Sequence, residues 1–365
     1  MLPIPQLTIN LAAIQANYRL LRDKASPAET GAAVKANGYG LGMIPTVHAL
    51  HKAGCRTFFT AYASEAAQLR EALTDVTVAP LHSLAPEQYP DMLARNITPV
   101  LNSLGEIESW SRFAKSQNKN LAAHVHLDTG MNRLGLPPDE QEKLIANPAL
   151  LDGITVKAWI SHYACSDEFG NPMTTQQRDL FKKQLARLPK APASICNSSG
   201  IFWGKDYLFD LTRPGVALYG VNPTPGKPNP MQDVIELKAP ILQIRHVDSP
   251  MTVGYGATHR VARKGCIATL ALGYADGYLR ALSGKGQVKI GQFLAPIVGR
   301  ISMDLTTVDV TGIPESEAHV GAFATVIGKH RPVDSVAAEA GTTGYEILTC
   351  LGSRLQRTYS GAEGA

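Results

Sequence analysis

The stretch Gly31-Ala-Ala-Val-Lys-Ala-Asn-Gly-Tyr-Gly-Leu-Gly42 begins with small and apolar residues, continues with a lysine and ends in glycines. Residues 31–35 have the composition of a short strand that is buried on both faces, and the glycines indicate a turn after it. Seven more segments of the same character follow before residue 214. They are residues 58–62, 76–80, 97–101, 122–127, 155–161, 192–196 and 208–213.

The stretches between these strands have the apolar spacing of amphipathic helices. Residues 63–73, for which Ser64 is the expected N-cap, and residues 176–187 are examples. Strands that alternate with helices predict a parallel sheet. Eight alternating units therefore predict an α/β fold with an N-terminal (β/α)8 barrel of the TIM type over residues 1–225. A doubly wound parallel sheet is the alternative.

A proline-rich stretch, Asn222-Pro-Thr-Pro-Gly-Lys-Pro-Asn-Pro230, follows the last unit and predicts a linker, because prolines stiffen the chain and remove backbone donors. Beyond it, apolar runs separated by glycine turns predict a C-terminal, mainly antiparallel β domain over residues 231–365. The spacing of residues 343–356 predicts a closing helix. The apolar runs are residues 239–245, 266–272, 294–299 and 322–328.

Composition and charge exclude several classes of protein. The net charge is only +4, from 35 lysines and arginines against 31 aspartates and glutamates, which gives neither a nucleic-acid footprint nor a polybasic membrane patch. The five cysteines are scattered and form no CxxC pair, so a reducing compartment fits best and no zinc site is indicated. The N-terminus lacks the cationic region of a signal peptide. We therefore expect a cytoplasmic protein that acts on a small molecule.

Lys35 allows two interpretations. A lysine at the end of a strand commonly extends its amine into solvent. An amine in an apolar setting instead loses part of its affinity for protons and can attack an aldehyde near neutral pH. The stretches Asn197–Gly200 and Arg213–Val216 follow the seventh and eighth strands, where barrels commonly bind phosphate. A nucleophilic lysine together with a phosphate site suggests pyridoxal 5'-phosphate.

Nine motifs then make the chain resemble the alanine racemases, enzymes of fold type III that use pyridoxal phosphate. The resemblance runs nearly end to end and implies a barrel followed by a β domain. It implies interconversion of L- and D-alanine, either to supply D-alanine for cell-wall peptidoglycan or for alanine catabolism. The motifs are AVKANGYGLG (33–42), LDTGMNRLG (127–135), SHYACSDE (161–168), NSSG (197–200), RPGVALYG (213–220), VGYGAT (253–258), GYADGY (273–278), GRISMD (299–304) and Tyr345-Glu346.

The resemblance also implies roles for individual residues. Lys35 would bind the cofactor covalently and act as one acid/base group, and Tyr255 would be the other, because racemisation needs a base on each face of a planar carbanion. Arg213 would face the pyridine nitrogen of the cofactor. No metal is implied. The cofactor-binding set is Lys35, Tyr39, His162, Asn197, Ser198, Arg213, Gly215, Val216 and Tyr345, and the substrate-binding set is Arg133, Met303, Asp304 and Tyr274.

Three features qualify this interpretation. The resemblance implies a homodimer, in which Tyr255 and Met303 enter the active site of the partner. Many members of the family carry a lysine at the position of His126, seven residues before Arg133, so how Arg133 is held is open. The alternative functions are a racemase of broader specificity for serine or basic amino acids, a fold-type III decarboxylase, and a pyridoxal-phosphate carrier. Arg213 argues against the decarboxylase, which has a glutamate there.

Overall fold

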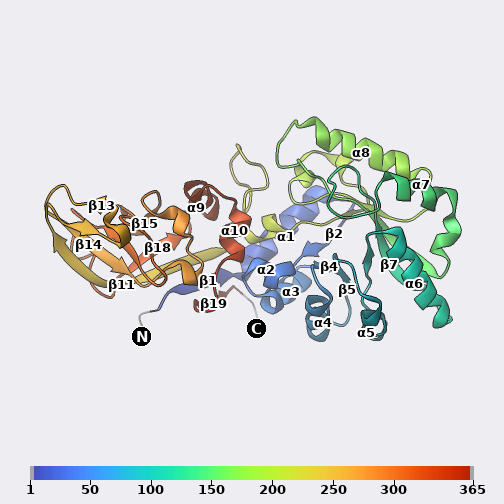
Figure 1. Cartoon of the computed structure of the whole chain (residues 1–365), viewed down its shortest axis with the longest axis horizontal. Helices are drawn as coiled ribbons and strands as arrows, with labels where there is room; N and C mark the ends of the chain where they lie inside the picture. Colours follow the sequence, from blue (N-terminus) through green and yellow to red (C-terminus); the bar gives the residue numbers. More distant parts are fainter. Residues whose placement is uncertain (1–3, 362–365) are drawn as a thin grey trace.

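The computed structural model describes residues 4–361 of the chain. Two parts lie end to end along its longest axis, a barrel on the right of Figure 1 and a β domain on the left. This confirms the predicted order of a barrel followed by a β domain. Residues 1–3 and 362–365, which the predicted domain boundaries include, lie outside the described residues.

Eight short parallel strands form the barrel at the positions that the sequence predicts. The first is divided into β2 (Glu29–Thr30), which pairs with the last strand, and β3 (Ala32–Ala33), which pairs with the second. Backbone hydrogen bonds also join the third strand to the fourth and the seventh to the eighth, so the sheet closes and the open doubly wound alternative is excluded. The other strands are β4 (Thr57–Thr60), β5 (Thr77–Pro80), β6 (Val100–Leu101), β7 (Leu121–His126), β8 (Ile154–Ile160), β9 (Ala193–Ser194) and β10 (Leu211–Thr212).

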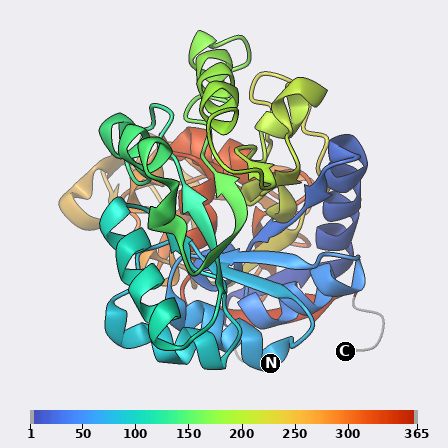
Figure 2. The ribbon, with the colours of Figure 1, turned by 90° about the vertical axis from the view of Figure 1, so that its right-hand side faces the viewer.

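Helices surround these strands (Figure 2). The predicted cap of the helix after β4 is wrong, because α4 begins at Ala63 and Tyr62, not Ser64, is its N-cap. Glu65 explains the start: its carboxylate accepts the N–H groups of Ala61 at 2.8 Å and Tyr62 at 3.3 Å. The helices of this part are α1 (Leu11–Ala25), α2 (Lys35–Tyr39), α3 (Met43–Lys52), α4 (Ala63–Ala72), α5 (Tyr89–Ala94), α6 (Leu104–Ser116), α7 (Pro138–Ala146) and α8 (Pro172–Leu185).

The long strand β11 (Ile235–Val247) organises the β domain, because it pairs antiparallel with β1, β14 and β18. The predicted closing helix is wrong beyond its first half: α10 (Gly344–Thr349) ends early and β19 (Gln356–Ser360) follows. The remaining elements are β12 (Thr252–Val253), β13 (His259–Arg260), β14 (Gly265–Leu270), β15 (Gln287–Ile290), β16 (Phe293–Pro296), β17 (Thr306–Asp309), β18 (Phe323–Ile327) and α9 (Val333–Ala340).

The first strand of the chain, β1 (Gln6–Asn10), lies in the β domain. It pairs antiparallel with β11 and parallel with β19, whereas the division at residues 1–225 and 231–365 assigns it to the barrel. The core is continuous: buried side chains from Leu7 to Leu355 form one cluster that runs through both parts. Among residues 4–361, no helix is both long and apolar enough to cross a membrane.

Candidate active site

A cavity of about 630 Å³ opens where the barrel strands reach their carboxyl ends, beside the junction with the β domain. Barrel enzymes hold their reacting groups at this face. The lining residues are Ala33, Lys35, Ala36, Tyr39, Phe59, Leu81, His82, His126, Arg133, Leu134, Ile160, Ser161, His162, Asn197, Ser198, Arg213, Gly215, Val216, Tyr345 and Thr349. Lys35, Arg133 and Arg213 bring three basic side chains, and none of these described lining residues is an aspartate or a glutamate. The cavity is therefore suited to anions.

Lys35 begins a turn of left-handed backbone. The φ angles of residues 36–40 lie between 53° and 83°, and three of these five residues are not glycines. In each of the three residues that are not glycines, left-handed backbone costs roughly 1–2 kcal/mol relative to right-handed backbone. Two side chains stabilise the turn: Glu65 Oε1 accepts the Ala36 N–H at 2.7 Å, and Asn37 Oδ1 accepts the Met43 N–H at 2.9 Å. Strain of this kind gathers at functional sites.

The surroundings of Lys35 favour the neutral amine. Burial is the main cause that lowers its pKa, and the positive charge of Arg133 lowers it further, while Glu65 acts in the opposite direction. A neutral amine is the form that attacks an aldehyde or removes a proton. Lys35 therefore has the electrostatic setting of a nucleophile and base.

Arg213 is buried without a carboxylate partner among the cavity-lining residues. Its guanidinium donates to the backbone oxygen of Ser194 at 2.9 Å, to the Ser194 hydroxyl and to the backbone oxygen of Ser161. Burial lowers its pKa to about 10. His162 Nδ1 lies 3.5 Å away, and burial together with Arg213 holds the pKa of this imidazole well below its ordinary value. Arg213 is thus the charged member of the pair, and His162 is neutral.

Hydroxyl groups and the backbone around Gly215 form a cradle at the other side of the cavity. Ser198 Oγ accepts the N–H groups of Gly215 at 2.9 Å and Ala217 at 3.3 Å. A Cβ atom at Gly215 would collide with the Tyr39 hydroxyl, so only glycine fits there. Tyr345, from α10, brings a second ring 6.4 Å from that of Tyr39. Burial raises the pKa of both phenols, to about 12 for Tyr345, which keeps them as donors.

The structure brings most of the predicted site residues together. All nine predicted cofactor-binding residues line the cavity, and so does Arg133. Tyr255, in a short 3₁₀ turn (Tyr255–Ala257), is 74% exposed on the β domain. Met303 is 53% exposed and lies beside Tyr274, since the Ala275 N–H donates to the Met303 oxygen at 3.0 Å. Tyr255, Tyr274, Met303 and Asp304 are not among the residues that line the cavity of their own chain.

Sequence analysis missed several lining residues. Leu81 directly follows β5 and the predicted strand 76–80, so its position was an available signal, whereas Phe59 lies inside β4 and inside the predicted strand 58–62. His82 follows Leu81, and its ring meets Tyr62 edge to face at a centroid distance of 4.7 Å. Apolar residues at strand ends are common in barrels of any function, so they could not be singled out.

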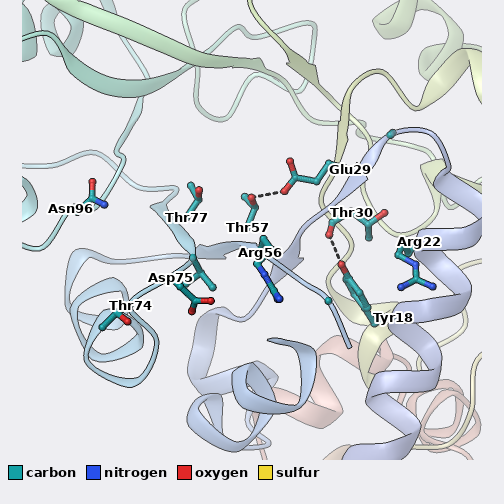
Figure 3. A pocket seen from close by; sticks show the side chains of 13 residues that line it. Tyr18, Arg22, Glu29, Thr30, Arg56, Thr57, Thr74, Asp75, Thr77 and Asn96 are labelled. Carbon is teal, nitrogen blue, oxygen red and sulfur yellow. Dashed lines mark hydrogen bonds between the residues drawn. The ribbon is translucent and has the colours of Figure 1, made fainter. Parts of the chain in front are cut away.

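A second hollow, of about 800 Å³, lies at the opposite end of the barrel strands (Figure 3). Two pairs of its lining residues bind each other: Thr57 Oγ1 donates to Glu29 at 2.6 Å and the Tyr18 hydroxyl donates to the Thr30 oxygen at 2.9 Å. Arg56 donates to the backbone oxygen of Cys55 at 2.9 Å. The amino-terminal end of a barrel serves stability, so this hollow is not the candidate site.

The barrel, the β domain and the lysine in the cavity beside their junction define the class of this protein. It is an enzyme of fold type III, a class of enzymes that use pyridoxal phosphate. The family profile described as "Alanine racemase, N-terminal domain" matches residues 9–223, and "Alanine racemase, C-terminal domain" matches residues 234–359. The chain belongs to the alanine racemase family.

Relatives and solved structures agree. The chain is 45% identical over 354 residues to the alanine racemase of Rickettsia africae. The aligned region covers 97% of this chain and 98% of that protein. It resembles the crystal structure of alanine racemase from Bartonella henselae with covalently bound pyridoxal phosphate, at a TM-score of 0.95 and 40% identity over 98% of this chain and 99% of that chain. The biosynthetic alanine racemase of Pseudomonas aeruginosa matches at a TM-score of 0.92 and 32% identity, over 99% of this chain and 100% of that one.

Proposed function

We propose that this protein interconverts L- and D-alanine and that pyridoxal 5'-phosphate is its cofactor. The observation that carries the proposal is the cavity, in which Lys35 has a lowered pKa and lies with two arginines, Arg133 and Arg213, and no lining carboxylate. A phosphate and a substrate carboxylate are anions, and this balance of charge accommodates both. The product would serve the cell wall or alanine catabolism.

The described residues fit the cofactor. Lys35 would bind it covalently through its amine, and the hydroxyls of Tyr39, Ser198 and Tyr345 would hold its phosphate together with the backbone of Gly215 and Val216. The cradle in which a Cβ at Gly215 has no room supports this assignment. When bound, the cofactor withdraws electrons from the α-carbon of the substrate and so acidifies its proton.

Arg213 and His162 would set the electronics of the site. Arg213 is fixed by the oxygens of two strands and would donate to the ring nitrogen of the cofactor. Its positive charge disfavours a proton on that nitrogen, which limits side reactions such as transamination. Asn197, whose side chain accepts from the Ser166 hydroxyl at 2.7 Å and the Gly200 N–H at 3.0 Å, would fix the loop that carries Ser198.

Two bases would move the α-proton. The Lys35 amine would remove or return it on one face of the substrate, and the Tyr255 hydroxyl on the other. Tyr255 stands exposed on the β domain, away from the cavity of its own chain, which supports its entry into the site of a second copy. The proposed assembly is therefore a homodimer with shared active sites.

The substrate would be held mainly by its carboxylate. Arg133, from the loop after β7, would bind it, with Met303 and Asp304 of the partner beside it and Tyr274 at the entry. The tyrosines that would crowd the pocket suit the methyl side chain of alanine.

We also propose that the protein is cytoplasmic, which is supported by five cysteines that are all free. We further propose that the barrel ends near residue 225 and that the β domain resumes near residue 231.

The test is to incubate the purified protein and pyridoxal phosphate separately with L-alanine, L-serine, L-lysine and L-arginine. Both enantiomers and any amine product are followed by chiral chromatography. Equal amounts of D- and L-alanine, with little product from the others, support the proposal. Faster racemisation of serine or a basic amino acid would instead make this a broader racemase, and an amine product would identify a decarboxylase. Lys35→Ala should abolish turnover.

A further inference from the structure

His126, at the end of β7, is paired with Asn102, which follows β6. His126 Nδ1 lies 2.8 Å from Asn102 Oδ1. The amide nitrogen of Asn102 donates to the backbone oxygens of Leu81 at 3.1 Å and Val100 at 3.2 Å. Because these two acceptors fix which end of the amide carries the nitrogen, the end that faces His126 is an acceptor. His126 Nδ1 must therefore be the donor of this pair.

The imidazole then has one free lone pair. Burial is the main cause that lowers the pKa of His126 to about 4; the charge of Arg213 and, to a smaller extent, that of Arg133 lower it further, while Asp128 acts in the opposite direction. The ring is neutral at physiological pH, so a proton on Nδ1 leaves Nε2 as an acceptor. His126 lines the active-site cavity, and its Nε2 makes no hydrogen bond with any residue from 4 to 361.

The loop that carries Arg133 rests on this ring. A Cβ atom at Gly135 would lie 2.9 Å from His126 Cδ2 and 3.0 Å from Cγ, and Gly135 has a φ of 99°. The backbone of the loop is thus seated directly on the edge of the imidazole next to Nε2. Arg133 lines the same cavity, and its guanidinium forms no hydrogen bond or ion pair within the described part of the chain.

We propose that His126 is a positioning residue for Arg133 in the substrate-bound enzyme. Its Nε2 would then accept a hydrogen bond from the guanidinium, a bond that the two side chains do not form in this structure, while other N–H groups of Arg133 bind the substrate carboxylate. This rests on the proposed role of Arg133. Arg133 has five N–H donors, so two can bind a carboxylate and another can bind Nε2. A neutral acceptor orients the guanidinium without cancelling its charge. Asn102 does not act on Arg133 itself; it accepts the hydrogen bond from His126 Nδ1 and so fixes the tautomer of that imidazole.

The first experiment compares His126→Leu with the wild-type protein, both loaded with pyridoxal phosphate. A hydrogen bond to a charged group stabilises by about 1.5–3 kcal/mol, which corresponds to a rise of about 10-fold to 100-fold in KM for alanine. The value of kcat should stay within about 3-fold, and so should the binding of the cofactor. Propionate, which has the carboxylate and methyl group of alanine but no amine, should inhibit competitively. Its inhibition constant should rise in His126→Leu by a factor similar to that for KM.

Two further variants decide whether the effect passes through Arg133. In an Arg133→Leu background, adding His126→Leu should change KM and the propionate constant less than about 2-fold. His48→Leu, an exposed histidine on α3, is the matched control and should change nothing. A KM that His126→Leu leaves unchanged, or raises equally in both backgrounds, overturns the proposal. If Arg133→Leu alone leaves KM and the propionate constant unchanged, the proposed role of Arg133 fails instead.

A measurement on the wild-type protein does not depend on how the variants fold. Nitrogen NMR of histidine-labelled protein, loaded with cofactor and propionate, reports which ring nitrogen carries the proton. His126 should show a protonated Nδ1 and an unprotonated Nε2 at pH 7. A protonated Nε2 would remove the acceptor and with it the proposal.

Discussion

We expect two inactive variants, Lys35→Ala and Tyr255→Phe, to restore activity to each other when their chains are mixed. Tyr255 is 74% exposed and does not line the cavity that holds Lys35 of the same chain. If the proposed homodimer joins each cavity to a tyrosine of the other copy, a hybrid dimer has one site with both changes and one site with neither. Random mixing makes about half of the dimers hybrids. Since one of the two sites in each hybrid is intact, about a quarter of all sites should be intact, and the activity should reach about a quarter of the wild-type value.

Each variant alone should be nearly inactive. A positioned acid or base contributes about 10²-fold to 10⁴-fold, which is about 3–5 kcal/mol in the activation free energy. The free energy of unfolding should change by less than about 0.5 kcal/mol in Tyr255→Phe, because the side chain is exposed and loses only its hydroxyl. Loss of turnover without loss of stability separates a catalytic role from a structural one.

The assay is co-refolding of the two variants in equal amounts, followed by chiral chromatography of the products from L-alanine. Wild-type chains treated in the same way set the full scale. The matched control mixes Lys35→Ala with the double variant Lys35→Ala/Tyr255→Phe, which can form no intact site. The reasoning is refuted if the first mixture is no more active than this control, or if Tyr255→Phe alone keeps near-normal turnover.

Two further predictions follow from packing and from charge. Gly215→Ala should weaken cofactor binding by about 10-fold or more, because its Cβ would displace the Tyr39 hydroxyl; equilibrium dialysis against pyridoxal phosphate measures this, and unchanged retention would contradict the cradle. Burial lowers the pKa of His124 to about 3, that of His126 to about 4 and that of His162 well below 6.5. The unfolded chain therefore binds more protons than the folded one below pH 6.5. As the pH is lowered, the free energy of unfolding should decrease by up to about 4 kcal/mol per pH unit near pH 5. Denaturant titrations at pH 7 and pH 5 measure this loss, and equal stabilities would contradict it.

The barrel could be predicted from the sequence because its strands are buried on both faces. Residues 57–60, Thr-Phe-Phe-Thr, are all buried, and such runs stand out without any alternation. The strands β1 and β19 do not stand out. Gln6–Asn10 is half-buried, Gln356–Ser360 is mostly exposed, and their identity as strands depends on pairing with each other and with β11.

The site could be predicted in part for a related reason. Lys35 and Arg213 end predicted strands and Ser198 follows one, and the geometry of a barrel brings strand ends together. The contact between His126 and Asn102 joins two strands through the orientation of one amide, which no spacing along the chain encodes. Tyr255 lies outside the cavity of its own chain, so its place in the site rests on family resemblance and not on the fold of a single copy.

The pairing of β1 with β11 and β19 means that the barrel is an insertion within the β domain. Residues Gln6–Asn10 lie in that domain, and the chain then leaves it at Leu11 to build the whole barrel and returns at Ile235. During synthesis the β domain cannot be completed until the barrel has emerged, and β1 has no partner strand until then. A fragment cut at the proline-rich stretch would lack β1 and would expose unpaired edges on β11 and β19, which is a hazard for aggregation. The two parts are therefore a single unit for expression and for folding.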